Sequence, residues 1–271
     1  MLGSTQAQQA SRKPDRRRLH SVTPARLNSR SQVFGLCVLV LSCAGLRAQD
    51  KCNAEVKLLL SSTQTQATIK ALNLKKEAAG RVYFFDTDTL GLLSQGLIIR
   101  LRQGADNDLT VKLRPQGERK SFVPHDTGKG FKCEVDLIDG VANPSYTVRI
   151  NYLARPVPET GSDIQGLLDI GQQRLLKNAQ ISVDWTHVRK IADIQATSWQ
   201  TSDQPNFNRL TLELWEWSGG EILELSAKVA PDAASSAYAA LRKLVSDKGL
   251  PLNNTQQAKT GIVLDMLKPT P

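Results

Sequence analysis

The 271-residue sequence has few aromatic residues, few cysteines and no long apolar run. Aromatic residues make up 5% of the chain, and neither a periodic repeat nor a membrane-length apolar stretch recurs, which excludes collagens, coiled coils and polytopic membrane proteins. The three histidines are scattered and no Cys-x-x-Cys motif occurs, so we expect no zinc site. What remains is an ordinary soluble composition, and its length allows one large domain or two small ones.

The positive charge of the chain is concentrated near its start. The formal net charge is +9, but the first 50 residues hold eight basic and two acidic groups and therefore carry +6 of it. Only +3 is left for the other 221 residues. The total is therefore no argument for a nucleic-acid partner, and we expect none.

An apolar segment, Val33 to Leu46, follows the basic stretch. Fourteen helical residues rise about 21 Å, which is too short for a hydrocarbon core of about 30 Å and is typical of an export signal. Cleavage after Ala48 is one possibility. Residues 40–43 also resemble a bacterial lipobox, in which Cys43 would carry a lipid anchor and provide the chain's only membrane contact. We therefore expect residues 1–50 to be a leader and 51–271 to be an exported domain, periplasmic or lipid-anchored; a cytoplasmic protein with a basic tail is the alternative.

From residue 53 the pattern predicts mainly short strands in one domain of about 220 residues. The expected strands are 53–60, 81–85, 97–103, 109–114, 132–138, 146–152, 188–197, 210–217, 221–229 and 261–267. Helical spacing or composition predicts helices at 63–74, 162–177 and 232–248.

Five of these strands alternate charged with apolar residues. Side chains two residues apart share a face of a strand, so each strand has one charged and one apolar face. The charged positions are Glu55 and Lys57, Arg100 and Arg102, Lys112 and Arg114, Glu134 and Asp136, and Glu224. The charged face can lie in water, or the sheet can close so that this face lines a tunnel suited to polyphosphates and divalent cations. Spacing alone does not choose between these arrangements.

The segment Val82 to Arg114 resembles the core of the CYTH family, the triphosphate tunnel metalloenzymes. Its Tyr83-Phe84-Phe85-Asp86-Thr87 strand end, Leu-rich turn, Arg100-x-Arg102 strand and Lys112 strand match the family pattern. Residues 134–136 and 221–228 resemble later acidic strands of the family, and the resemblance covers roughly residues 53–268. It implies an α+β, mainly antiparallel fold, in which an eight-stranded closed tunnel barrel carries flanking helices.

The resemblance also implies a function and a site. Members bind or hydrolyse triphosphate compounds or polyphosphate with Mg²⁺ or Mn²⁺, so the expected partner is a polyanionic small molecule or polyphosphate. The implied phosphate-binding residues are Arg100, Arg102, Lys112, Arg114 and Lys190. Lys57 and Glu134 are the implied catalytic residues, and Glu55, Asp136 and Glu224 the implied metal ligands. The oligomeric state is not implied.

Two departures from the family pattern bear on activity. Asn53 stands where the family's opening Glu-x-Glu-x-Lys has its first carboxylate, and Ser226 stands where the late Glu-x-Glu has its second. Fewer carboxylates weaken the affinity for a divalent cation. A hydrolase and a non-catalytic phosphoanion-binding envelope protein with a degenerate metal site therefore both stay open.

The same resemblance suggests a disulfide. Cys52 lies one residue before the strand that starts at Asn53, and Cys133 lies one residue before Glu134 in the strand 132–138. If both strands line the tunnel, the two cysteines would mark equivalent levels of it. An exported chain meets an oxidising compartment, and we expect the two to be bonded there. Two buried unpaired thiols are the alternative.

Overall fold

The computed structural model describes residues 52–125, 128–152 and 156–267, all of which belong to the unit Ser42–Pro271. The expected leader, its cleavage site and the Cys43 anchor lie outside these residues. In the described part of the chain, no helix is long and apolar enough to span a membrane.

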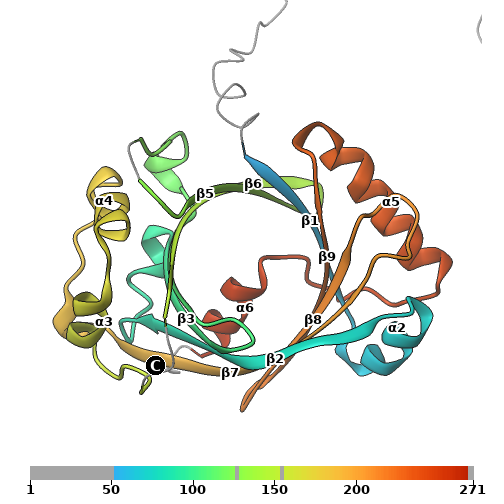
Figure 1. Ribbon diagram of the computed structural model, residues 1–271, viewed down its shortest axis with the longest axis horizontal. Helices are drawn as coiled ribbons and strands as arrows, with labels where there is room; N and C mark the ends of the chain where they lie inside the picture. The colour runs from blue at the N-terminus through green and yellow to red at the C-terminus, as the bar shows by residue number, and fades with distance from the viewer. Residues whose placement is uncertain (1–51, 126–127, 153–155, 268–271) are drawn as a thin grey trace, which may run out of the picture. The chain divides into compact units, whose positions relative to one another are not determined.

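In the described residues, nine strands close into a barrel in the order β1-β5-β6-β4-β3-β2-β7-β8-β9 (Figure 1). The strands are β1 (Asn53–Leu60), β2 (Lys75–Asp86), β3 (Leu97–Gly104), β4 (Asp108–Leu113), β5 (Phe131–Ile138), β6 (Val141–Asn151), β7 (Arg189–Thr201), β8 (Leu210–Trp217) and β9 (Gly220–Val229). The expected closed barrel is confirmed, but its expected number of eight strands is wrong.

The odd number of strands has a direct structural consequence. A closed ring of nine strands cannot reverse direction at every pair, so at least one pair must be parallel. That pair is β1 and β5, and every other neighbouring pair is antiparallel. The parallel register sets Glu55 beside Asp136 and Asn53 beside Glu134, so the closure of the ring brings the acidic residues together.

Five α-helices accompany the barrel in the described residues: α2 (Thr65–Ala71), α3 (Gly161–Leu167), α4 (Ile170–Asn178), α5 (Ala234–Asp247) and α6 (Lys259–Met266). The single helix expected over 162–177 is two helices, because Leu168 is extended and Asp169 starts a capping box for α4. The strand expected at 261–267 is wrong. This segment is α6, whose buried residues Thr260, Val263 and Leu264 have helical spacing.

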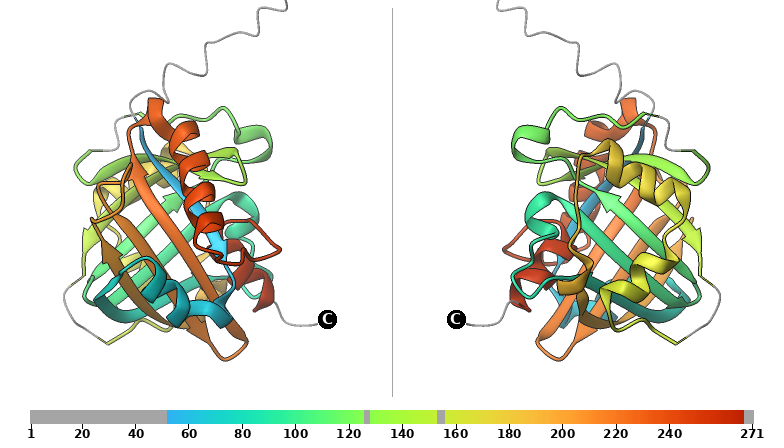
Figure 2. Two further views of the ribbon diagram at one scale, coloured as in Figure 1. Left: turned by 90° about the vertical axis from the view of Figure 1, so that its right-hand side faces the viewer. Right: turned by 90° about the vertical axis from the view of Figure 1, so that its left-hand side faces the viewer.

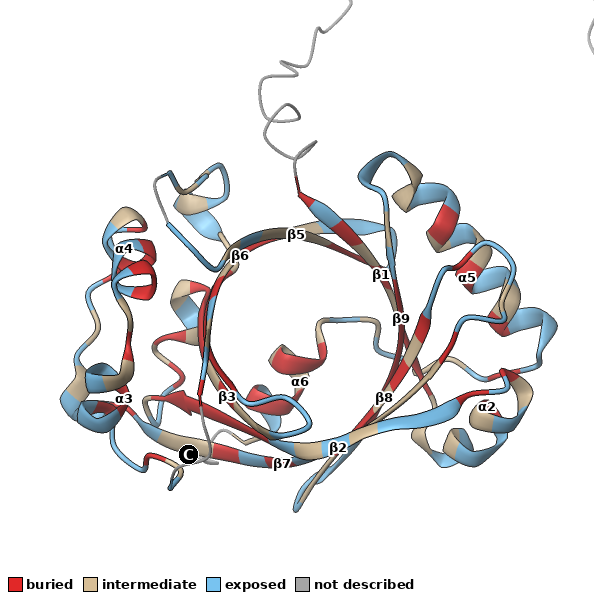
Figure 3. Ribbon diagram, viewed as in Figure 1, coloured by how far each residue is buried: buried red, intermediate tan, exposed pale blue. Residues whose placement is uncertain are grey.

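The apolar faces of the strands point outward and are covered by helices. Helices α3 and α4 lie on one side of the barrel and α5 and α2 on the other, while α6 lies at one end (Figures 1 and 2). Ile99 and Leu101 of β3, for example, share a buried cluster with Ile164 of α3 and Leu175 of α4. Figure 3 shows buried stretches in red on the barrel strands and on α4. The charged positions of the same strands therefore face inward, which settles the tunnel as the correct arrangement.

Cys52 and Cys133 form a disulfide, as expected. Cys52 precedes β1 and Cys133 lies on β5, and their Cα atoms are 4.6 Å apart. The bond links two residues that lie 81 positions apart in the sequence, and it joins β1 to β5, the two parallel strands. It therefore fixes the strand pair that carries Glu55, Glu134 and Asp136.

Candidate functional site

A cavity of about 340 Å³ lies inside the barrel. It is lined by residues of β1, β2, β3, β4, β5, β6, β8 and β9, by Arg114 directly after β4, and by Ala258, Lys259 and Thr260 at the start of α6. The volume is at the small end of the roughly 300–1,000 Å³ that ligand pockets occupy. Because α6 packs Val263 and Leu264 against the barrel residues Phe84 and Ile98, the helix forms the floor of this cavity.

Positive charge predominates in the lining. Its nine cationic residues are Lys57, Arg100, Arg102, Lys112, Arg114, Lys132, Arg149, Lys228 and Lys259, and its four carboxylates are Glu55, Glu134, Glu213 and Glu224. Asp106, Asp108 and Asp136 lie outside the lining and pair with its cations. Nine cations against these seven carboxylates leave an excess of two positive charges. Such an enclosed excess favours a polyanionic ligand.

Asp136 is the centre of the largest ion-pair cluster in the cavity wall. Its fully buried carboxylate lies 2.9 Å from the Lys57 Nζ, 2.9 Å from the Arg114 Nη2 and 3.6 Å from the Lys112 Nζ. Burial alone would raise the pKa of Asp136, but Lys57, Lys112 and Arg114 hold it well below its usual range. Burial likewise lowers the pKa of Lys57, but Asp136, Glu55 and Glu224 outweigh it and raise that pKa well above its ordinary value. Both groups are therefore charged at neutral pH.

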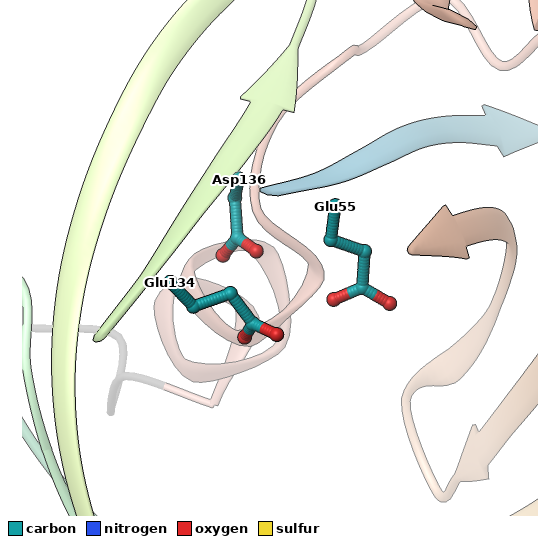
Figure 4. Close-up of side chains that lie close together, drawn as sticks. All are labelled: Glu55, Glu134 and Asp136. Atoms are coloured by element: carbon teal, nitrogen blue, oxygen red, sulfur yellow. The ribbon is translucent and has the colours of Figure 1, made fainter. Parts of the chain in front are cut away.

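Three carboxylates of this wall form a group that could hold a metal ion. Oxygens of Glu55, Glu134 and Asp136 lie within 4.8 Å of one another, and the three side chains converge (Figure 4). Oxygen ligands of this kind suit Mg²⁺ and Mn²⁺. The Lys57 Nζ contacts one oxygen of Glu55 at 3.0 Å, and Glu134 is paired with Lys228, whose side chain is 71% exposed and free to swing into solvent. The donor set therefore fits one divalent ion, held chiefly by Glu55 and Glu134 at the cavity surface.

Arg100 and Lys112 are lining cations whose pKa values are lowered by burial. The Arg100 Nε is buried without a hydrogen-bond partner, and among the described residues its guanidinium has no ion pair. Burial, followed by the neighbouring charge of Arg102, lowers the pKa of Arg100 to about 10. Burial, together with the charge of Arg114, lowers the pKa of Lys112 to about 8. A polyanion bound in the cavity would stabilise the positive charges of Arg100 and Lys112.

The other residues expected to bind phosphate are placed differently. Arg102 lines the cavity but is paired with Asp108 and Asp106, and Arg114 is paired with Asp136. Lys190 is not part of the lining; its Nζ pairs with Glu159 and lies over the ring of Tyr83.

A β-bulge accounts for the position of Lys190. It lies between Phe84 and Phe85, so that Ala192 pairs with the inward Phe84 while Lys190 pairs with Phe85, which packs in the outer cluster. Lys190 consequently faces away from the cavity.

The opposite wall contains a second charged group, of which the sequence predicted Glu224 but not Glu213 or Lys259. Glu213 of β8 and Glu224 of β9 face each other in register, and Lys259 of α6 pairs with both. The Lys259 Nζ also lies 4.4 Å from the centre of the Trp215 ring. The alternation of Glu213 and Trp215 with leucines indicates that these two residues share the inward face of β8. No local sequence pattern predicts that Lys259 lies in the cavity.

Asp86, in the motif that carries the family resemblance, has a structural role. Its buried carboxylate accepts hydrogen bonds from the backbone N–H groups of Thr87, Leu92 and Leu93 at 2.6, 2.8 and 2.9 Å. These bonds hold the turn between β2 and β3 in place. The position of this turn sets the register of the strand that carries Arg100.

Two comparisons of sequence find no match: no family model and no curated protein matches the chain. Solved structures do match. A proposed adenylyl cyclase from Hippeastrum, described as having a dominant triphosphatase activity, aligns with a TM-score of 0.53 at 20% identity over 78% of this chain and 94% of its own. A proposed adenylate cyclase from Bacillus halodurans aligns with a TM-score of 0.52 at 15% identity over 78% and 97%. Likeness at this identity establishes the fold, and the chain has the CYTH-like tunnel fold that its sequence resembles.

Proposed function

We propose that this protein binds the phosphate chain of a triphosphate or short polyphosphate inside the barrel and hydrolyses it with one divalent metal ion. The observation that carries the proposal is Arg100, a half-buried cation whose Nε is buried without a hydrogen-bond partner and which has no ion pair among the described residues, in a cavity with excess positive charge. A buried uncompensated charge is costly unless a ligand of opposite sign completes it. The triphosphatase activity ascribed to the Hippeastrum protein of the same fold supports this reading.

The residues of the cavity divide into distinct tasks. Arg100 and Lys112 bind phosphate oxygens, because Arg100 has no ion-pair partner among the described residues and the Lys112 Nζ lies no closer than 3.6 Å to a carboxylate oxygen. Lys57 holds Glu55 and Asp136 in place by pairing with both carboxylates. Glu55, Glu134 and Asp136 would hold a Mg²⁺ or Mn²⁺ ion, which would supply Lewis-acid polarisation of a phosphoryl group. Glu134, which reaches the cavity surface, would offer the metal one carboxylate oxygen and accept the proton of the attacking water with the other.

The preferred ligand is an inorganic phosphate chain rather than a nucleotide. Phe84 and Trp215 are the aromatic residues in the lining, and neither offers a free face to a base. Trp215 has the Lys259 ammonium over its ring and Phe84 packed at a centroid distance of 5.7 Å. With no stacking surface available among these lining residues, discrimination rests on the phosphates. Tripolyphosphate should therefore compete against ATP for the same cavity and bind more tightly.

A second candidate function is binding without turnover. The observation that favours it is the neutral character of two lining positions, Asn53 and Ser226, which reduces the charge that can hold a metal. In this case the protein would capture phosphoanions with the same cations. Arg100 and Lys112 would still bind phosphate oxygens, and Glu134 would have no catalytic role.

Phosphate release distinguishes the two candidates. The full chain is incubated with tripolyphosphate and Mg²⁺ or Mn²⁺, beside Lys112→Ala, Glu134→Gln and the surface control Lys243→Ala. The hydrolase predicts release by the wild type and the control, and strongly reduced release by the other two. Binding without release would establish the second candidate. Release that is unaffected by Lys112→Ala would contradict both.

We also propose that the domain works outside the cytoplasm, as the basic and apolar leader suggests. The Cys52–Cys133 disulfide supports this proposal, because such bonds persist in oxidising compartments. Fractionation of cells that produce the full chain should place it outside the cytoplasm. The chain remaining in the cytosol would contradict the proposal.

A further inference from the structure

The carboxylates on the wall opposite the Glu55 group raise a separate question about metal stoichiometry. Glu213 and Glu224 are directly opposite in the β8–β9 register and point to the same cavity. Residues in that relation have Cβ atoms about 4.5–5.5 Å apart, and two like charges there are destabilising. Glu224 is also only 5% exposed, so little water screens the repulsion. A cation must lie between the two carboxylates.

The chain supplies that cation from α6. The Lys259 Nζ is 2.9 Å from the Glu224 Oε1 and also pairs with the Glu213 Oε2. The remaining oxygen of Glu213 accepts a hydrogen bond from the Trp215 Nε1 at 2.8 Å. Both Glu213 oxygens are thus engaged, unlike those of Glu55, where Lys57 contacts one oxygen.

The Lys259 ammonium is fixed rather than mobile. The residue is 9% exposed, and its charge lies over the face of Trp215. The helix that carries it is anchored by Val263 and Leu264 in the apolar cluster at the barrel end. Burial alone would lower the pKa of Lys259, but Glu213 and Glu224 raise it; the same pairing, against burial, lowers the pKa of Glu213 to about 2.

We infer that Lys259 acts as a built-in substitute for a second divalent cation, so that the cavity takes one metal ion, at Glu55, Glu134 and Asp136. A divalent ion needs carboxylate oxygens at about 2.0–2.6 Å, and the ammonium occupies that space between Glu213 and Glu224. Ser226 agrees with this assignment, because it leaves Glu224 as the carboxylate of that stretch of β9 facing the cavity. The inference rests on the proposed function, since it concerns the metal requirement of the same cavity.

The test is to count bound Mn²⁺ by electron paramagnetic resonance, without substrate, for the full chain and for Lys259→Met. Loss of the ammonium leaves the buried Glu224 and the half-buried Glu213 facing each other without a cation, and we expect the variant to bind one Mn²⁺ more than the wild type. The double variant Lys259→Met/Glu213→Gln should lose this additional ion. Lys243→Met, on the surface of α5, should match the wild type. An unchanged count in Lys259→Met would overturn the inference.

Thermal unfolding keeps the test decisive if Lys259→Met is too unstable in the absence of metal. Mn²⁺ should then restore folding of the variant and raise its midpoint by more than that of the wild type. A variant that stays unfolded in Mn²⁺ would also overturn the inference. The wild-type count tests the proposed function separately: a wild type that binds no Mn²⁺ contradicts the proposed metal, while the gain in Lys259→Met still reports on Lys259.

Discussion

Replacing Asp136 with asparagine should destabilise the apo protein and yet increase the stabilisation that tripolyphosphate provides. In the wild type the buried carboxylate neutralises Lys57, Arg114 and Lys112 at 2.9, 2.9 and 3.6 Å. A neutral amide at this position would leave three enclosed cations without that partner. Removal of one side of a buried ion pair costs about 3–5 kcal/mol.

The loss of stability in Asp136→Asn can be measured by thermal unfolding in the presence of a metal chelator, which removes any contribution of bound metal. For a domain of this size each kcal/mol corresponds to about 2–4 °C, so the midpoint should fall by roughly 6–20 °C. Tripolyphosphate should then raise the midpoint of Asp136→Asn by more than that of the wild type, because the freed cations bind it. Asp193→Asn is the matched control: its carboxylate is 41% exposed and pairs with Arg81, so its loss should cost less than about 1 kcal/mol.

The pH dependence of stability gives a second measurement of what the Asp136 carboxylate contributes to folding. The folded pKa of Asp136 is depressed, so its contribution is fully present above the unfolded pKa of about 3.9 and is lost as the pH falls below that value. The wild type should therefore lose stability below about pH 4 more steeply than Asp136→Asn does. Equal destabilisation by Asp136→Asn and Asp193→Asn, or a variant that tripolyphosphate stabilises less than it does the wild type, would refute the reasoning.

Lys112, Asp86 and the disulfide each give a further prediction. Because the pKa of Lys112 is lowered to about 8, its positive charge is lost as the pH rises through that value. The affinity for tripolyphosphate, measured by calorimetry, should therefore weaken above about pH 8 in the wild type. It should not weaken in Lys112→Arg, whose guanidinium stays charged. Asp86→Asn should lower the free energy of unfolding, measured by urea denaturation, by about 2 kcal/mol, because it weakens three backbone hydrogen bonds to a carboxylate. A loss below about 0.5 kcal/mol would contradict the role of Asp86 in holding the turn between β2 and β3. Reduction of the Cys52–Cys133 bond, which spans 81 residues, should cost about 4 kcal/mol by the chain-entropy relation; intact mass must first show two hydrogens fewer without reductant, and an unchanged mass would rule out the bond.

The alternating charges of the strands predicted most of the charged residues in the cavity lining, because a strand's period of two is local and independent of the rest of the fold. Arg100, Lys112 and Glu134 were found in this way, and all three line the cavity. The choice between a solvated sheet and a tunnel was not local. It depends on whether the ring closes, and here the family resemblance supplied what the spacing did not.

The features that sequence reasoning missed all depend on contacts between distant segments. The parallel pairing of β1 with β5 follows from closure of a nine-stranded ring. Lys190 faces away from the cavity because of one bulge in β7, where Ile191 has no partner in β2. Lys259 reaches Glu213 and Glu224 because α6 packs into the barrel end, although the same segment reads as a strand from its local pattern.

Calorimetric titration of tripolyphosphate into the metal-free full chain tests most directly whether the cavity binds polyanions. The account predicts binding by the wild type, with an affinity that Arg100→Gln lowers by about ten- to a hundredfold, the worth of a hydrogen bond to a charged group. Arg242→Gln, on the surface of α5, should bind like the wild type. Absence of binding by the wild type, or equal affinity of the three proteins, would contradict the account.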